Sequence, residues 1–203
     1  MLVGNDVVDL HDSENRPEAL HTRFDARVFA SDERAALSAS ASVHQLRWTL
    51  WAAKESAYKV ARKLDFAVRF LPKDFVVRQI AGGRAVVMHE IGSFDVLLDR
   101  TDDWVCAVAT LTSVDAWSIR RPLSVGIEQL GMPGADPSRT VRELACAAIG
   151  SRMNLPPGQV QMAVDRGIPV ALWRNRRLPV DLSLSHHGRF VAWACGDCAI
   201  PAG

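Results

Sequence analysis

The chain has 203 residues, of which 48% are hydrophobic and 23% charged, and its formal net charge is +1 at pH 7. This balance is typical of a soluble globular protein and excludes an overall field toward nucleic acid or an anionic membrane. No apolar run approaches the roughly 18 residues of a membrane-spanning helix, and the N-terminus lacks the charged and apolar regions of a signal peptide. We therefore expect a cytoplasmic protein.

The first predicted element is a short strand that begins near Gly4. The alternation of side chains along a strand places Asp6 and Val8 on one face and Asp9 on the other. An aspartate in such a strand is most often an edge or turn residue, so the strand alone does not indicate a site.

The next predicted element is a long amphipathic helix over residues 43–63. The segment has no Gly or Pro, and apolar residues recur every three or four positions, at Leu46, Leu50, Ala53, Ala57 and Val60. Glu55 and Lys59 are four residues apart, so their Cβ atoms lie roughly 5–6 Å from each other on one face. The spacing alone is typical of an ordinary ion pair on a helix surface.

The rest of the chain shows a similar order of elements twice. Strand-like segments follow the helix at residues 75–78, 84–88, 94–98 and 104–109. A second series has a strand at 125–128, a helix over about 138–153, and strands at 160–164, 182–185 and 190–194. This order predicts an α+β fold with two similar halves, residues 1–112 and 123–203, joined by a linker over 113–122. Two unrelated α+β segments could give the same order by chance, whereas a duplication would create a cleft for ligands between the halves.

The four cysteines allow two interpretations. Cys195 and Cys198 form a C-x-x-C, which could be redox-active or half of a zinc site, but no second pair with suitable spacing exists. Cys106, Cys146 and Cys195 stand in apolar strand-like or helix-like runs. We expect these three to be core residues, because a free cysteine behaves as a small hydrophobe.

Four short motifs in the first half occur in the order found in one enzyme family. They are the Gly-x-Asp of residues 4–6, the segment 29–33, the segment 51–59 that contains Lys54, Glu55 and Lys59, and residues 70–72 with Phe75. In this order they resemble the metal-binding half of the 4′-phosphopantetheinyl transferases. Each motif is weak alone, and the resemblance depends on their sequence together.

The second half resembles the coenzyme-A-binding half of the large, surfactin-synthetase-type members. The resemblance rests on Arg142 in the second helix, the Gly-Ile-Pro turn that ends at Pro169, and residues 182–190, which contain Ser185 and His186. In those members this half comes first, so the chain reads as a circularly permuted pseudo-dimer, cut between Cys198 and Gly4. We expect the strand 190–194 to pair beside the strand 2–8.

The resemblance implies transfer of the 4′-phosphopantetheine arm of coenzyme A to a serine of an acyl or peptidyl carrier protein, releasing adenosine 3′,5′-bisphosphate. Asp6 and Glu55 would hold Mg²⁺, with Mn²⁺ as an alternative, because hard divalent ions favour carboxylate oxygens. Lys59 would contact the pyrophosphate, and Glu55 would accept the serine proton. Lys54 points about 100° around the helix from Glu55 and ranks below Lys59. The pseudo-dimer would act as a monomer.

The coenzyme A contacts would come from the second half. His186 resembles the histidine that contacts the 3′-phosphate, with Ser185, Arg142 and Pro169 nearby. Without the resemblance, His186 would read as a turn residue and Arg142 as a solvated helix position. The run 173–177, with three arginines, is either an exposed loop, a docking patch for acidic carrier proteins or an extra phosphate contact.

Three positions depart from the family pattern. Val8 stands where the large members often have a second acid, Ile168 replaces the lysine of a Gly-Lys-Pro turn, and His187 replaces a small residue. Arg166 is a candidate to replace the lost lysine. These departures favour a second hypothesis, a non-catalytic binder of coenzyme A or a carrier protein. A redox or zinc protein built on Cys195 and Cys198 is a third. The sequence does not name the carrier, the third metal ligand or the acceptance of acylated coenzyme A.

Overall fold

The computed structural model describes residues 1–112, 123–131 and 134–197, and these form an α+β fold, as predicted. The first half runs through β1 (Val3–Asp9), a 3₁₀ turn (Ser13–Asn15), α1 (Phe24–Val28), α2 (Ser31–Ala39), α3 (Val43–Leu64), β2 (Val76–Ala81), β3 (Arg84–His89), β4 (Gly92–Arg100) and β5 (Trp104–Leu111). The second has β6 (Leu123–Gln129), α4 (Pro137–Arg152), β7 (Val160–Asp165), β8 (Ile168–Trp173), β9 (Arg176–Arg177), β10 (Val180–His187) and β11 (Phe190–Asp197). The predicted linker and Cys198 lie outside the described residues.

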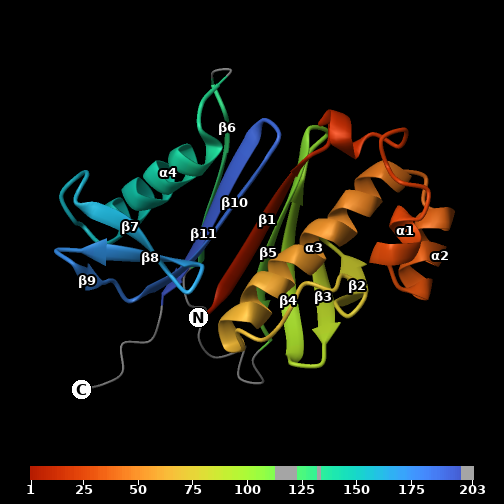
Figure 1. Cartoon of the computed structure of the whole chain (residues 1–203), viewed down its shortest axis with the longest axis horizontal. Coiled ribbons are helices and arrows are strands. Elements are labelled where there is room, and N and C mark those ends of the chain that lie inside the picture. The colour runs from red at the N-terminus through yellow and green to blue at the C-terminus, as the bar shows by residue number, and fades with distance from the viewer. Residues whose placement is uncertain (113–122, 132–133, 198–203) are drawn as a thin grey trace.

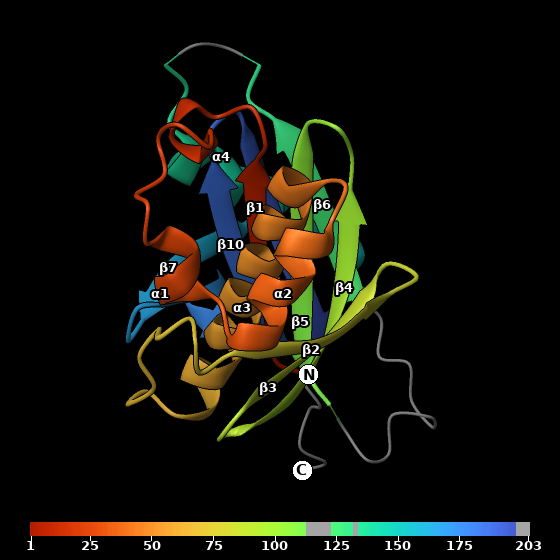
Figure 2. The same ribbon diagram turned by 90° about the vertical axis from the view of Figure 1, so that its right-hand side faces the viewer.

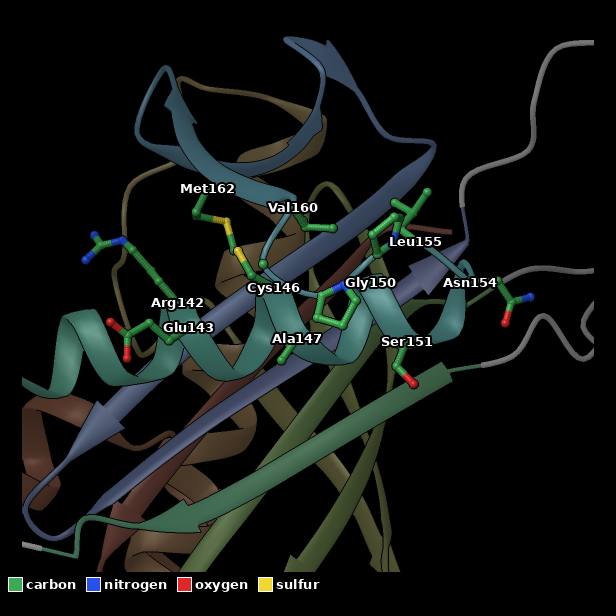
Figure 3. A pocket seen from close by; sticks show the side chains of 13 residues that line it. Arg142, Glu143, Cys146, Ala147, Gly150, Ser151, Asn154, Leu155, Val160 and Met162 are labelled. Carbon is green, nitrogen blue, oxygen red and sulfur yellow. The ribbon is translucent and has the colours of Figure 1, made fainter.

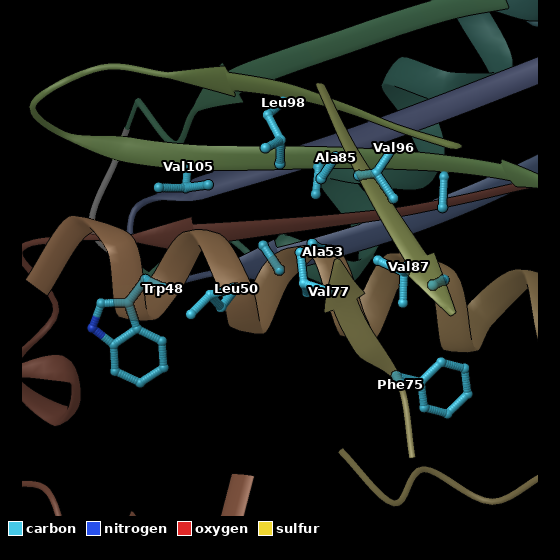
Figure 4. Close-up of a cluster of buried hydrophobic side chains, with 14 of the residues drawn as sticks. Trp48, Leu50, Ala53, Phe75, Val77, Ala85, Val87, Val96, Leu98 and Val105 are labelled. Carbon is cyan, nitrogen blue, oxygen red and sulfur yellow. The ribbon is translucent and has the colours of Figure 1, made fainter. Parts of the chain in front are cut away.

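The first half is an antiparallel sheet with α3 across one face (Figures 1 and 2). The strand order is β1-β5-β4-β3-β2. The apolar stripe of α3 packs on alternate residues of the strands, and Figure 4 shows part of this core, with Leu50 and Ala53 of α3 facing Val96 and Val105. The apolar residues that recur every 3.6 positions in α3 therefore pack against those that recur every second position in the strands, in one buried layer.

The described part of the second half has two three-stranded sheets and one helix. The sheet order is β10-β11-β6, and β7-β8-β9 form a separate three-stranded sheet. Helix α4 begins after Asp136, whose side chain accepts hydrogen bonds from the Ser138 and Arg139 amides, and Pro137 fits its first turn. Its buried face, which includes Ile149, packs over β10 and β11. The second core is thus built separately from the first.

The two halves meet along β1, the edge strand of the first sheet, which lies next to β10 of the second half (Figure 1). An apolar cluster joins them, with Val3 and Val7 of β1 and Cys106 and Val108 of β5 against β11. The predicted pairing of residues 190–194 with β1 is wrong, because both edges of β11 are taken by β10 and β6. The neighbour of β1 across the junction is β10, and β1 keeps its backbone ladder with β5.

No helix in the described part of the chain is long and apolar enough to cross a bilayer.

Candidate active site

Asp6 of β1 and Glu55 and Lys59 of α3 converge at the junction between the halves, midway along β1. The Lys59 ammonium donates to the backbone oxygen of Asn5 at 2.7 Å and to Asp6 Oδ1 at 3.2 Å, and it lies 3.4 Å from Glu55 Oε1. The Asp6 side chain is buried, whereas Glu55 and Lys59 remain 28% and 24% exposed. The structure therefore brings together the three residues predicted to be catalytic, with the two of α3 open to solvent.

A close approach of β1 to α3 creates this geometry. A Cβ atom at Gly4 would lie 2.1 Å from the backbone oxygen of Ser56, so only glycine allows the strand to lie this near the helix. Asp6, two residues further along, then points at the helix face that carries Glu55 and Lys59. Val8 points the same way and is buried in the main core, which confirms the predicted alternation along the strand.

The electrostatics of the site favour a cation. Burial raises the pKa of Asp6 well above its ordinary value; the Lys59 ammonium offsets part of this rise and the Glu55 charge adds to it. For Lys59, burial alone would lower the pKa, but Asp6 and Glu55 raise it, so the ammonium stays charged. A metal ion at Asp6 would compete with a proton, so its affinity should rise with pH.

The two carboxylates fit a hard divalent ion whose remaining ligands are oxygens of a bound phosphate or of water. Mg²⁺ is commonly held by one or two carboxylates plus substrate phosphates and water, and Asp6 and Glu55 supply two converging carboxylates. Among the described residues no group of three or more His, Cys, Asp or Glu side chains could hold a metal. Val8 cannot be a third ligand, because its side chain is apolar and buried.

Lys54 has a structural role. Its side chain is 0% exposed, and its ammonium donates to Glu33 Oε2 at 2.7 Å and to the backbone oxygens of Pro72 and Phe75. The other Glu33 oxygen accepts from the Val77 amide. The two motifs at residues 29–33 and 51–59 are therefore joined by a buried ion pair, which ties α2, α3 and β2 together.

The residues predicted to contact coenzyme A are less closely gathered. Ser185 is buried and its Oγ accepts from the Asn5 side chain at 2.9 Å, so it lies beside β1. His186, the next residue of β10, is exposed. Pro169 is the second residue of β8, which follows a turn whose Gly167 lies near the Arg62 side chain of α3. This turn therefore stands against the same helix that carries Glu55 and Lys59.

Arg142 lies apart from these residues. Its guanidinium folds back on Ser138 in the preceding turn of α4, and no described contact joins it to Ser185 or His186. It stands at the rim of a groove of about 940 Å³ between α4, β7 and the loop that connects them, in which Met162 points toward Cys146 (Figure 3). The groove is not lined by Asp6, Glu55 or Lys59.

The arginine-rich run is a hairpin between β8 and β9. Arg174 and Asn175 have φ values of +50° and +61°, as a tight turn of this kind requires, and residues 174–177 are exposed. The turn lies at the opposite end of β8 from Pro169, roughly 17–20 Å away for a six-residue strand. The exposed-loop interpretation therefore fits better than a phosphate contact at the same site.

The prediction that three cysteines are core residues is confirmed for two of them, and the third lies at the margin of the core. Cys106 and Cys195 are buried, and Cys146 is partly buried. Burial raises the pKa of the Cys106 thiol to about 12 and also raises the pKa of Cys195, so both stay protonated. Cys198, the second cysteine of the C-x-x-C, lies outside the described residues.

The ion pairs between the halves were not predicted from the sequence. At one end of β1, Asp9 accepts from the guanidinium of Arg189 at 2.8 Å through both oxygens. At the other end, the Lys63 ammonium donates to Asp181 Oδ2 and to the backbone oxygens of Val3 and Leu182. The only signal was polar residues within or beside apolar segments, which does not identify partners 118 and 180 residues away.

Comparison with known proteins decides the family. A family model described as "4'-phosphopantetheinyl transferase superfamily" matches residues 2–109, more than half of the chain. The chain belongs to this superfamily. The matched segment runs from β1 into β5, of which only the last two residues lie outside the match. It therefore includes Asp6, Glu55 and Lys59.

One solved structure similar to the chain is holo-[acyl-carrier-protein] synthase of Thermotoga maritima. The two share 18% sequence identity with a TM-score of 0.42, and the match covers 68% of this chain and 73% of that one. No curated protein gives a significant match.

Proposed function

We propose that this member of the superfamily transfers the 4′-phosphopantetheine group of coenzyme A to a serine of an acyl or peptidyl carrier protein, releasing adenosine 3′,5′-bisphosphate. The observation that carries the proposal is the convergence of Asp6, Glu55 and Lys59 within the segment that matches the family model. The proposed partners are coenzyme A and the carrier protein, and a cytoplasmic location stays a prediction.

The reaction moves a phosphoryl group from a pyrophosphate to a neutral hydroxyl. The side chains of the site must therefore hold the pyrophosphate, offset its charge and remove the serine proton. Asp6 and Glu55 would hold Mg²⁺, or Mn²⁺ in its place, which when bound would neutralise part of the pyrophosphate charge. Lys59 brings a further positive charge to the same point, where its ammonium already lies within 3.4 Å of three oxygens.

Glu55 is the proposed base for the serine hydroxyl. Its carboxylate is more exposed than that of Asp6, so an incoming serine can reach it. Since a free glutamate is a weak base near neutral pH, its contribution depends on placement beside the reacting hydroxyl, directly or through water.

The coenzyme A contacts are proposed for His186, Ser185, Arg142 and Pro169, with Lys59 on the pyrophosphate. What supports Ser185 and His186 is their strand, β10, which lies along β1 and so beside Asp6. The exposed imidazole of His186 is accessible to a phosphate. Arg142 has the weakest support, because its guanidinium faces its own helix.

We also propose that the chain is a permuted pseudo-dimer of residues 1–112 and 123–203, active as a monomer. The strand orders β1-β5-β4 and β6-β11-β10 correspond, and each first strand carries a Val-Gly-x-acid sequence, at Asp6 and at Glu128. The Met1 ammonium donates to the backbone oxygen of Asp197 at 2.6 Å, so the two ends of the described chain lie together, as a relocated break requires.

The test of the function is direct. The protein is incubated with coenzyme A, Mg²⁺ and each of several apo carrier proteins, and the intact mass of each carrier is followed. We expect a phosphopantetheine adduct on at least one. If coenzyme A binds and no carrier gains mass, the second candidate, a non-catalytic coenzyme A or carrier binder, replaces the first. The observation that favours this candidate is the buried, apolar Val8 at the second-acid position.

A further inference from the structure

On the edge of β1 that faces away from β5, backbone N–H groups donate hydrogen bonds to side chains of β10. The amides of Val3, Asn5 and Asp9 donate to Asp181 Oδ2, Ser183 Oγ and His187 Nδ1, at 2.7, 2.9 and 3.2 Å. Each pair is 178 residues apart, so the two strands run in the same direction in constant register. Side chains here replace the backbone ladder that an edge strand otherwise seeks.

Asn5 is the residue of this edge that reaches both sides of the candidate site. Its backbone oxygen accepts from the Lys59 ammonium at 2.7 Å, and its side-chain Nδ2 donates to Ser185 Oγ at 2.9 Å. Ser185 directly precedes His186. Asn5 thus contacts both Lys59, the proposed pyrophosphate contact, and the strand that carries His186, the proposed 3′-phosphate contact.

The side-chain amide of Asn5 is incompletely hydrogen-bonded, which limits what it can add to the stability of the fold. The residue is 0% exposed, and its Oδ1 has no hydrogen-bond partner among the described residues. A buried acceptor without a partner destabilises the folded state, and a leucine of similar size would remove it, although Ser185 Oγ would then lose the Asn5 donor. The two effects oppose each other, so we expect the side-chain amide of Asn5 to contribute little to the free energy of folding.

We infer that Asn5 is a positioning residue, whose amide fixes Ser185 and through it His186 relative to Lys59, so that the two phosphate-bearing parts of coenzyme A meet their contacts together. The inference rests on the proposed function. It requires the Asn5 side chain to act on coenzyme A affinity while leaving the fold intact.

The test uses Asn5→Leu in the whole protein, with Ser183→Ala as the matched control. Ser183→Ala removes the acceptor of the Asn5 backbone N–H but leaves the hydrogen bond from the Asn5 side chain to Ser185. We expect Asn5→Leu to melt within about 3 °C of wild type, and Ser183→Ala to melt roughly 2–10 °C lower because it strands a buried donor. Circular dichroism and thermal unfolding measure both.

Coenzyme A affinity, measured by calorimetry, should show the reverse order. Asn5→Leu should bind coenzyme A about 3- to 10-fold more weakly, with KM for coenzyme A raised to the same extent and kcat changed less than about two-fold. Ser183→Ala should bind as wild type at a temperature where both are folded. Adding Ser185→Ala to Asn5→Leu should weaken binding no further than Ser185→Ala alone, because the two changes break one interaction.

Three results separate the inference from the proposed function. If wild type transfers and Asn5→Leu keeps the affinity and KM of wild type, the inference about Asn5 is wrong and the function stands. If Asn5→Leu loses as much stability as Ser183→Ala, Asn5 is an ordinary core residue and the inference is again overturned. If wild type itself neither binds coenzyme A nor modifies a carrier, the proposed function and the inference fail together.

Discussion

Two lysines of α3, five positions apart, have opposite surroundings. Lys54 is enclosed and paired with Glu33, whereas Lys59 faces two carboxylates at the partly open junction. The helical period explains which of them turns toward β1, and the sequence ranking of Lys59 above Lys54 followed from it. The partner of Lys54 could not be predicted in this way, because it depends on how α2 docks.

The first prediction concerns Glu55. Glu55→Gln removes the proposed base and one charge of the metal site while keeping the size of the side chain. We expect transfer to fall by about 10²-fold or more, with coenzyme A binding largely retained, because the coenzyme contacts come mostly from other residues. Carrier mass shift measures the first and calorimetry the second. Glu143→Gln, an exposed change on α4, is the control, and a Glu55→Gln variant that transfers at the wild-type rate would exclude Glu55 as the base.

The second prediction concerns His186. Replacing the exposed imidazole by alanine leaves the β10 ladder intact and removes one contact to a phosphate. We expect His186→Ala to bind coenzyme A roughly 10-fold more weakly, while adenosine-free pantetheine phosphate, which lacks the 3′-phosphate, binds equally to both proteins. His21→Ala, at another exposed histidine, is the control. Unchanged coenzyme A affinity would refute the role of His186.

At the scale of elements, periodicity predicted the long helix and most strands to within a few residues. The helix predicted over 43–63 is α3, Val43–Leu64, and the strands 160–164 and 190–194 became Val160–Asp165 and Phe190–Asp197. The helices α1 and α2 were not predicted, because α1 has only five residues and α2 buries a charged residue, Glu33, on its inner face. Binary patterns do not identify a helix whose buried face is held by an ion pair.

The third prediction tests the contact of β1 with α3. Gly4→Ala forces the strand away from Ser56, which should destabilise the protein by about 1–3 kcal/mol and shift Asp6 from Glu55. Transfer at a temperature where the variant is folded should fall at least about 10-fold, because small displacements of catalytic groups are costly. Gly131→Ala, where a Cβ meets nothing within 4 Å, is the matched control. Equal stability and activity of Gly4→Ala and Gly131→Ala would contradict the proposed dependence on this contact.

At the scale of the whole molecule, the junction between the halves depends on charges as well as on apolar contacts. Asp9 is 2% exposed, and although burial alone would raise its pKa, the hydrogen bonds from Arg189 and from the His11 amide hold it at about 2. An acid whose pKa is lowered by folding stabilises the folded state above its unfolded pKa, near 4, and this contribution is lost as pH falls from about 4 to 2.

The fourth prediction follows from this sign. Between pH 4 and pH 2 wild type should lose about 1–2 kcal/mol more than Arg189→Met, a figure reduced for the solvent around the half-exposed guanidinium. Urea unfolding at several pH values measures the difference. Asp103→Asn, which removes only the weaker, exposed contact of Arg189, should keep most of the wild-type acid dependence. Parallel pH curves for wild type and Arg189→Met would show that Asp9 does not gain its low pKa from this pair.

The fifth prediction concerns the order of the halves. A permuted chain that joins residue 203 to residue 1 through a short Gly-Ser linker and opens within 113–122 should fold, because the Met1 amino group already lies at Asp197. We expect near wild-type stability and transfer, and a monomeric mass by light scattering. An insoluble permuted chain, obtained under conditions where wild type is soluble, would count against the proposed break point.

The order of the motifs suggested a break of this kind, but the pairing at the junction could not be predicted. Strand pairing was expected between β1 and β11 because the proposed permutation cuts the chain between these two segments. The actual contact uses Asp181, Ser183 and His187 as acceptors for β1. Such a contact depends on side-chain identity and on the distance between two sheets, and periodicity carries neither.

The side-chain edge between β1 and β10 has a consequence for how relatives can diverge. A backbone ladder tolerates almost any side chain, whereas this junction needs an acceptor at positions 181, 183 and 187 of the second half. Apolar replacements there would leave buried amides of β1 without partners, although none of these positions is proposed to touch a substrate. In relatives that share this junction we therefore expect side chains that accept a hydrogen bond to recur at these three positions, even where the surrounding core has been repacked.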